Sequence, residues 1–101
     1  MINVIASIRI QPGKRSDFLE IFKANVPRVR EERGCIEYVP AVDIEAGFVP
    51  QSVDENVVTV IEKWESLDAL RDHIHSEHML AYKDRVKDMV EDMSLKILEE
   101  A

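Results

Sequence analysis

The chain has few of the residues that build disulfide-rich or membrane-spanning proteins. Its 101 residues include a single cysteine, Cys35, so no internal disulfide can form and no second thiol is available for a metal site. No apolar run approaches the roughly 20 residues that cross a bilayer. Residues 1–14 show neither a basic leader nor a small-residue cleavage site. We therefore predict a cytoplasmic protein without a membrane span.

Positive charge and glycine are also scarce. The 13 basic residues are outnumbered by 20 acidic ones, and the net charge of −7 repels nucleic acid and anionic lipid. We therefore predict no nucleic-acid partner. With only three glycines there is no phosphate-binding loop, and neither a GxSxG nor an HExxH motif is present. The chain as a whole is 46% hydrophobic and 33% charged, a composition typical of a folded protein. Residues 1–101 are predicted to form a single domain.

Hydrophobic periodicity predicts four strands and three helices. Residues 2–10 alternate as a strand, and after the turn at Pro12-Gly13 a helical stripe is expected to continue to Arg33, with Gly34 as its cap. Residues 35–39 form a second strand that ends at Pro40, and a long loop covers residues 41–56. Residues 57–65 form a third strand with apolar residues on both faces. Ser66 then caps a short helix that ends near Ser76.

The last part of the chain is predicted to hold a longer helix and a short strand. The helix carries an apolar stripe composed of Met79, Tyr82, Val86, Met89, Val90 and Met93, and residues 95–98 close the chain as the fourth strand. This element order is the split pattern of an α+β, ferredoxin-like sandwich. Its helices cover only one face of the sheet, while the third strand is apolar on both faces. We therefore predict a homodimer formed through the open face.

Chemically capable side chains are concentrated between Glu62 and Tyr82. A helical wheel places His73 and His78 on opposite edges of an apolar stripe, where both can border a cavity, while His75 points away. A histidine in that position titrates near neutrality and can take a proton from a phenolic hydroxyl. Each of these histidines also has a purely structural interpretation as a packed or hydrogen-bonded surface residue.

Structural interpretations also apply to the other candidates. Trp64 can be a core residue with Glu62 as its polar partner. Tyr38 and Tyr82 can be explained by ordinary amphipathic packing. His73 and Glu77 have i,i+4 spacing, but three histidines without an ordered carboxylate partner are a weak ligand signal. No metal site is therefore predicted.

Several short motifs resemble the antibiotic biosynthesis monooxygenase superfamily. The segments GCIEY and IEKWES, followed by His73 and His78, are similar to that superfamily's GC-x-x-Y strand, E-x-W-E-S strand end and H-x-x-x-x-H helix. The match runs essentially from end to end. The long loop is similar to the bacterial quinol monooxygenase branch at a further set of positions: Tyr38, Pro40, Val42-Asp43, Ala46-Gly47 and Gln51-Ser52, with Ile97-Leu98 in the closing strand.

The resemblance implies a dimeric α+β barrel with one pocket per subunit. It also implies oxygenation or oxidation of quinols or similar small aromatic substrates by dioxygen, without metal, flavin or haem. In such a pocket, either His73 or His78 takes the substrate proton. The substrate-binding residues are then Tyr38, Phe48, Glu62, Trp64 and Tyr82, with Tyr38, Phe48 and Trp64 holding the aromatic ring.

Two other functions remain open at this stage. The superfamily includes an isomerase of a small phosphorylated, sugar-like signal, for which Arg71 and Lys63 are the nearby cations. The same fold also serves non-catalytic modules that bind small ligands. Haem-degrading relatives carry an asparagine well inside the first strand, where this chain has Ala6, so haem cleavage is not expected.

Overall fold

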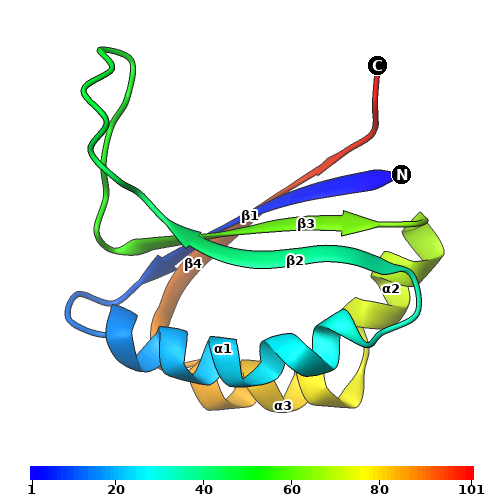
Figure 1. Cartoon of the computed structure of the whole chain (residues 1–101). Helices are drawn as coiled ribbons and strands as arrows, with labels where there is room; N and C mark the ends of the chain where they lie inside the picture. Colours follow the sequence, from blue (N-terminus) through cyan, green and yellow to red (C-terminus); the bar gives the residue numbers. More distant parts are fainter.

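Four antiparallel strands form one sheet, and the helices lie on one side of it (Figure 1). The computed structural model describes residues 1–101. The elements are β1 (Ile2–Ile10), α1 (Arg15–Arg30), β2 (Cys35–Val42), β3 (Val57–Trp64), α2 (Leu67–Ile74), α3 (Glu77–Val86) and β4 (Val90–Leu98). The strand order is β2-β3-β1-β4, and all three neighbouring pairs are antiparallel. The predicted ferredoxin-like fold is confirmed, with its second helix broken into α2 and α3.

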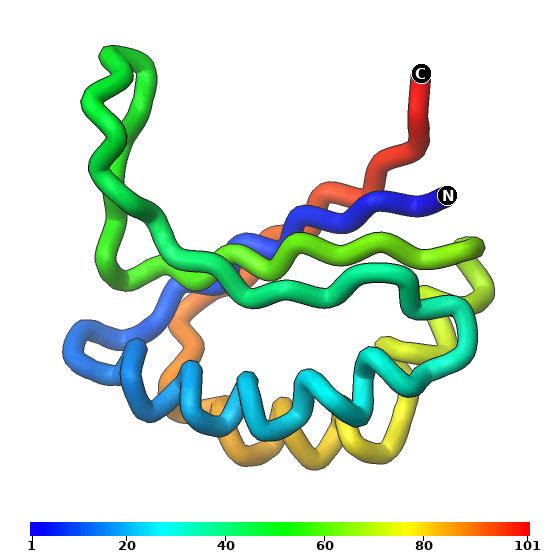
Figure 2. The backbone as a smooth tube through the Cα atoms, in the orientation of Figure 1, coloured from blue at the N-terminus to red at the C-terminus, as the bar shows by residue number.

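The core lies between the sheet and α1 and α3, which run side by side beneath it (Figure 2). β1 turns alternate residues toward the helices, because successive side chains of a strand point to opposite faces. These residues are at most 4% exposed: Val4, Ala6, Ile8 and Ile10. From α1, Phe22 stacks on Tyr38 of β2 with ring centroids 5.5 Å apart, and this contact fixes the helix against the sheet.

The second strand is longer than predicted. It does not end at Pro40 but continues to Val42, pairing Pro40 with Val60 and Val42 with Val58 of β3. Proline lacks the backbone N–H that a central strand needs on both sides. β2 lies at the edge of the sheet, where one side of the strand has no partner, so Pro40 is tolerated there.

The start of the fourth strand was also predicted wrongly. The last helix ends at Val86, and β4 begins at Val90 instead of residue 95. Met89, Val90 and Met93 fit a helical stripe by spacing alone, but this segment pairs with β1 from Ile10 back to Asn3. Long-range pairing with a central strand therefore overrides the local helical pattern.

A long loop, residues 43–56, leaves the sheet on the side opposite the helices (Figure 1). Two contacts of Asp54 fix the base of this loop. The backbone N–H of Asp54 donates to Asp43 Oδ2 at 2.9 Å, and its carboxylate forms an ion pair with Arg9 at 2.9 Å. The tip exposes apolar side chains, with Phe48 72% and Val49 99% exposed.

The face of the sheet that the helices leave open carries several apolar side chains. Ile5 of β1 lies opposite Ile61 of β3, and Val39 of β2 lies opposite the same residue. Ile61 is 39% exposed. Of the helices on the other face, none combines the length and the hydropathy needed to cross a lipid bilayer.

Candidate active site

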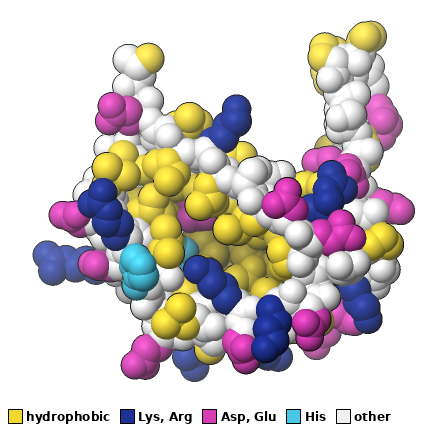
Figure 3. Space-filling view, turned by 180° about the vertical axis from the view of Figure 1, so that it is seen from behind, with side chains coloured by type: hydrophobic (Ala, Val, Ile, Leu, Met, Phe, Trp, Pro, Cys, Tyr) yellow, Lys and Arg dark blue, Asp and Glu magenta, His cyan; other side chains and the backbone are white.

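An apolar cavity of about 360 Å³ lies between the sheet and the helices. Fifteen of its 19 lining residues are hydrophobic, and the hollow is visible in the space-filling view (Figure 3). It lies beside β4, whose cavity-facing Met93, Leu95 and Ile97 remain 45% to 50% exposed because no helix covers them. Two exposed lysines, Lys83 and Lys87, also line it. Such a shape accommodates a flat, mostly apolar molecule.

Glu62 supplies the only carboxyl group that lines the cavity. The residue is 7% exposed, and its Oε1 accepts a hydrogen bond of 3.0 Å from the indole Nε1 of the fully buried Trp64. Burial raises the pKa of Glu62 to about 7, while the Trp64 hydrogen bond opposes that rise and the Glu32 carboxylate adds to it. A carboxyl group with this pKa can exchange a proton near neutrality.

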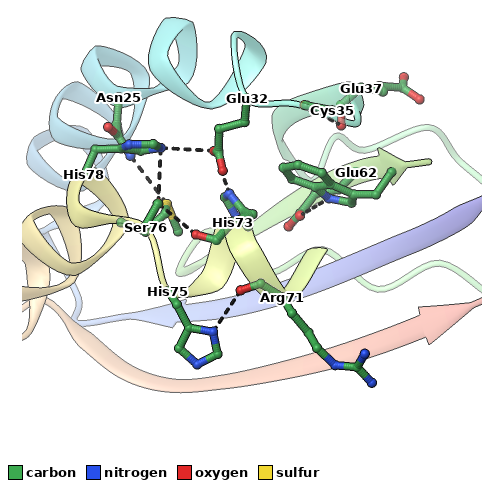
Figure 4. A network of polar contacts seen from close by, with 12 residues as sticks. Asn25, Glu32, Cys35, Glu37, Glu62, Arg71, His73, His75, Ser76 and His78 are labelled. Atoms are coloured by element: carbon green, nitrogen blue, oxygen red, sulfur yellow. Dashed lines mark hydrogen bonds and ion pairs between the residues drawn. The ribbon is translucent and has the colours of Figure 1, made fainter. Parts of the chain in front are cut away.

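His73 lies beside Glu62 in the same wall and is 3% exposed. Its ring packs against Trp64 at a centroid distance of 4.6 Å and meets the Tyr38 ring edge-on at 5.4 Å. Its Nδ1 is 2.9 Å from Glu32 Oε2 (Figure 4). Burial lowers the pKa of His73, and the hydrogen bond with Glu32 opposes that change.

Four polar atoms of the residues that line the cavity have no hydrogen-bond partner within the protein. The side-chain hydrogen bonds of this region use only Nδ1 of His73 and Oε1 of Glu62, and they leave the hydroxyls of Tyr38 and Tyr82 without a partner. Every fully buried side-chain nitrogen or oxygen atom has a hydrogen-bond partner. His73 Nε2, Glu62 Oε2 and the two hydroxyls therefore keep accessible surface, and all four residues line the cavity.

Residues 1–85 match the family described as antibiotic biosynthesis monooxygenase. The chain belongs to this family. "Probable quinol monooxygenase YgiN" of Escherichia coli K12 is 42% identical to the chain over 101 residues, with 98% of this chain and 97% of the relative covered. Family membership, which the sequence motifs predicted, is thus confirmed. It indicates a monooxygenase at the level of the family.

Solved structures agree with the fold of this family member. Rv0793 from Mycobacterium tuberculosis superposes with a TM-score of 0.81 at 25% identity, covering 99% of this chain and 94% of its own. PA3566 from Pseudomonas aeruginosa gives a TM-score of 0.83 at 24% identity, covering 99% and 93%. Both likenesses run over nearly the whole length, so the sheet and helices that form the cavity are common to all three.

The cavity of this family member brings together four of the seven residues predicted to form its site. His73, Tyr38, Glu62 and Tyr82 line it, and Trp64 lies directly behind Glu62 and His73. Phe48 does not join them, since it lies 72% exposed on the loop of residues 43–56. Within one chain, the aromatic ring that the prediction assigned to Phe48 is therefore missing from the cavity.

The predicted position of His78 beside the cavity is wrong. Its side chain is 21% exposed and lines a separate groove between α1 and α3. The helical wheel failed because α2 ends at Ile74 and His78 belongs to α3, so one wheel cannot describe both histidines. His75 is exposed and bonds the Arg71 carbonyl of its own helix, pointing away as predicted.

Glu32 is the functional candidate that sequence reasoning missed. It lies two residues beyond the end of α1, and one of its carboxylate oxygens contacts both His73 and His78. A carboxylate just past a helix C-terminus lies at the unfavourable end of the helix dipole. That was the only local signal, because the two histidines follow Glu32 by 41 and 46 positions.

Replacing Glu62 with glutamine is expected to stabilise the fold increasingly as the pH rises above about 4.5, with the full gain reached above about pH 7. Because the folded-state pKa is raised from 4.5 to about 7, stability is fully present below about pH 4.5 and is lost as the pH rises through 7. Glutamine cannot ionise, and its amide oxygen still accepts from Trp64. The expected gain in the free energy of unfolding is on the order of 3 kcal/mol near pH 8.

Urea denaturation of the wild type and of Glu62→Gln between about pH 4 and pH 8.5 measures this difference. A difference that stays constant over the whole range would show that folding does not raise the pKa of Glu62.

Proposed function

We propose that the chain is a cofactor-independent monooxygenase that acts on quinols or similar small aromatic diols. The observation that carries this proposal is the pairing of a mostly apolar cavity with His73 Nε2 and Glu62 Oε2, neither of which has a partner within the protein. The hydrophobic walls suit an aromatic ring, and the two polar atoms suit its hydroxyl groups. The 42% identical relative, named "Probable quinol monooxygenase YgiN", supports the same substrate class.

The proposed reaction begins when a substrate hydroxyl gives its proton to His73 Nε2. The resulting quinol anion is a much better electron donor than the neutral quinol, so the substrate itself reduces dioxygen. One oxygen atom then enters the ring and the other leaves as water, and the product is a hydroxyquinone. Glu62 accepts a hydrogen bond from the second hydroxyl, while Tyr38 and Tyr82 border the ring and Trp64 supports Glu62 and His73 from behind.

Oxygen uptake by the purified chain with a reduced naphthoquinone such as menadiol tests the proposal. We expect saturable uptake above the buffer's own autoxidation rate, in protein treated with a metal chelator and shown by absorbance to hold no flavin or haem. With ¹⁸O₂, one labelled oxygen atom is expected in the quinone product. Saturable quinone binding without turnover would instead identify a ligand-binding module.

The isomerase alternative fits this cavity poorly. A phosphorylated sugar requires a cluster of cations, but Lys63 lies on the open face of the sheet, and Arg71 pairs with Asp68 on the surface of α2. Neither lines the cavity, where the only cations are the exposed Lys83 and Lys87. Competition by a sugar phosphate in the oxygen-uptake assay would favour the isomerase.

We also propose that two copies associate through the open faces of their sheets. The open face carries apolar side chains that no helix covers, among them Ile5, Val39 and Ile61. Burying such a surface against a second sheet is favourable by about 25 cal/mol for each Å² of apolar area. Sedimentation equilibrium at micromolar concentration is expected to give twice the chain mass of 11.6 kDa, and a single-chain mass would contradict the proposal.

A further inference from the structure

The two histidines near the site are held by one carboxylate oxygen. Glu32 Oε2 is 2.9 Å from His73 Nδ1 and 3.0 Å from His78 Nε2 (Figure 4). The Glu32 side chain is only 14% exposed. Because His73 belongs to α2 and His78 to α3, this oxygen joins the end of α1 to both of the other helices. Neither the cavity nor the proposed reaction requires such a joint, so its role calls for an explanation.

The shared oxygen determines which nitrogen of each ring carries a proton. An ionised carboxylate only accepts hydrogen bonds, so both ring nitrogens that face it must be N–H donors. For His73 the proton is then on Nδ1, and in the neutral ring Nε2 is left with its lone pair. Nε2 is the His73 nitrogen without a partner in the protein, and His73 lines the cavity.

We propose that Glu32 is a positioning residue that holds His73 as the Nδ1–H tautomer, so that Nε2 presents its lone pair to the substrate. The inference rests on the proposed function, because it assigns His73 as the proton acceptor. Without the carboxylate, nothing else within reach of Nδ1 fixes the proton there, since Glu32 is the only hydrogen-bond partner of this ring. A ring with its proton on Nε2 cannot accept one from the substrate.

His78 and Ser76 keep Glu32 in place. His78 donates to the same oxygen from the other side, and its Nε2 lies 3.3 Å from Ser76 Oγ. Ser76 Oγ in turn donates to the backbone carbonyl of His73 at 2.8 Å. The turn between α2 and α3 thus closes a ring of contacts around the carboxylate, and this ring limits the rotation of the Glu32 side chain.

Charges around His73 set the pH at which it accepts a proton. The groups that face it come from every neighbouring element: Glu32 after α1, Tyr38 of β2, Glu62 and Trp64 of β3, and His78 and Lys83 of α3. Glu32 favours the protonated ring, whereas burial, His78 and Lys83 disfavour it. Removal of the Glu32 charge is therefore expected to lower the pKa of His73 further.

Glu32→Gln and Glu32→Ala test this role, with Glu31→Gln as the matched control. Glu31 precedes Glu32, is exposed, and makes no side-chain contact with a histidine, so its variant removes the same charge without touching the joint. For Glu32→Ala we expect kcat of quinol oxidation to fall about 10²-fold with KM changed less than about threefold, because Glu32 does not line the cavity. For Glu32→Gln we expect a smaller loss and an acid limb of the kcat/KM profile that moves to lower pH.

A second readout does not depend on activity. In ¹⁵N-labelled wild-type protein, NMR is expected to show a protonated Nδ1 and an unprotonated Nε2 for His73 near neutral pH. Glu32→Ala is expected to lose this pattern, and Glu31→Gln to keep it. Since the chain has only three histidines, the variants His75→Gln and His73→Phe together complete the assignment of the signals.

The two readouts separate failure of this inference from failure of the proposed function. If the wild type does not oxidise quinols but His73 has the expected tautomer and loses it in Glu32→Ala, the positioning role stands and the assigned reaction falls. If His73 carries its proton on Nε2 in the wild type, or keeps the same tautomer in both Glu32 variants, the inference is overturned. Should Glu32→Ala fail to fold, Glu32→Gln decides through the pKa of His73 followed by NMR, and a pKa no lower than in the wild type would overturn the inference.

Discussion

Replacing His73 with alanine is expected to lower kcat for quinol oxidation by about 10²- to 10⁴-fold, the usual contribution of a positioned general base. His73 is the one histidine that lines the cavity, and its Nε2 has no partner within the protein. His78→Ala is expected to cause a smaller loss, because His78 reaches the site only through Glu32. Oxygen uptake with menadiol, corrected for autoxidation, measures both effects.

Two controls separate chemistry from packing in this experiment. His73→Phe keeps a ring between Trp64 and Tyr38 but removes both nitrogens, so it is expected to be as inactive as His73→Ala while retaining more stability. The dissociation constant of the oxidised quinone is expected to change less than the rate does. Wild-type rates in both the His73→Ala and His78→Ala variants would remove the histidines as proton acceptors and leave Glu62 as the remaining candidate.

Replacing Gly34 with alanine is expected to lower the free energy of unfolding by about 3 kcal/mol. Gly34 has a φ of +86°, which disfavours any side chain, and a Cβ built there would lie 2.5 Å from the Cβ of Ala69 on α2. Because the other atom is itself a Cβ, the backbone of β2 or α2 must shift to relieve the contact. The shift also displaces Glu32, two residues earlier, so quinol turnover is expected to fall together with stability.

Gly13→Ala is the matched control for this prediction. Gly13 has a similar φ of +82°, but no atom lies within 4 Å of its built Cβ. It therefore isolates the conformational part of the loss, which is about 1 kcal/mol. Urea denaturation of both variants gives the difference, and equal losses would show that Gly34 and Ala69 are not tightly packed.

His73 and His78 show how much of the site could be predicted from sequence patterns. The motifs correctly indicated the family, and the apolar stripe correctly placed His73 at the cavity. His78 was placed wrongly, because the chain turns at Ser76 and the direction of the next helix is set by its packing on α1. Glu32 was missed for the same reason: its contacts with both histidines exist only after three helices have docked.

Local sequence patterns were sufficient to predict the elements whose periodicity has one interpretation. Period-two alternation in residues 2–10 produced β1, and Ser66 capped α2 as predicted, its Oγ accepting from the Ala69 N–H at 3.1 Å. These features depend on neighbours a few residues away, so local patterns suffice for them.

Other features depend on partners far along the chain and could not be predicted from local patterns. Pairing with β1 determined where β4 begins, and the edge position of β2 allowed Pro40 within a strand. The prediction that the first helix continues to Arg33 with Gly34 as its cap was wrong: α1 ends at Arg30, and Gly34 lies close to Ala69 of α2. The cavity and the oxygen shared by His73 and His78 also depend on how helices dock on the sheet. Periodicity assigns a side chain to a face, but the position of that face relative to other elements is set by long-range packing.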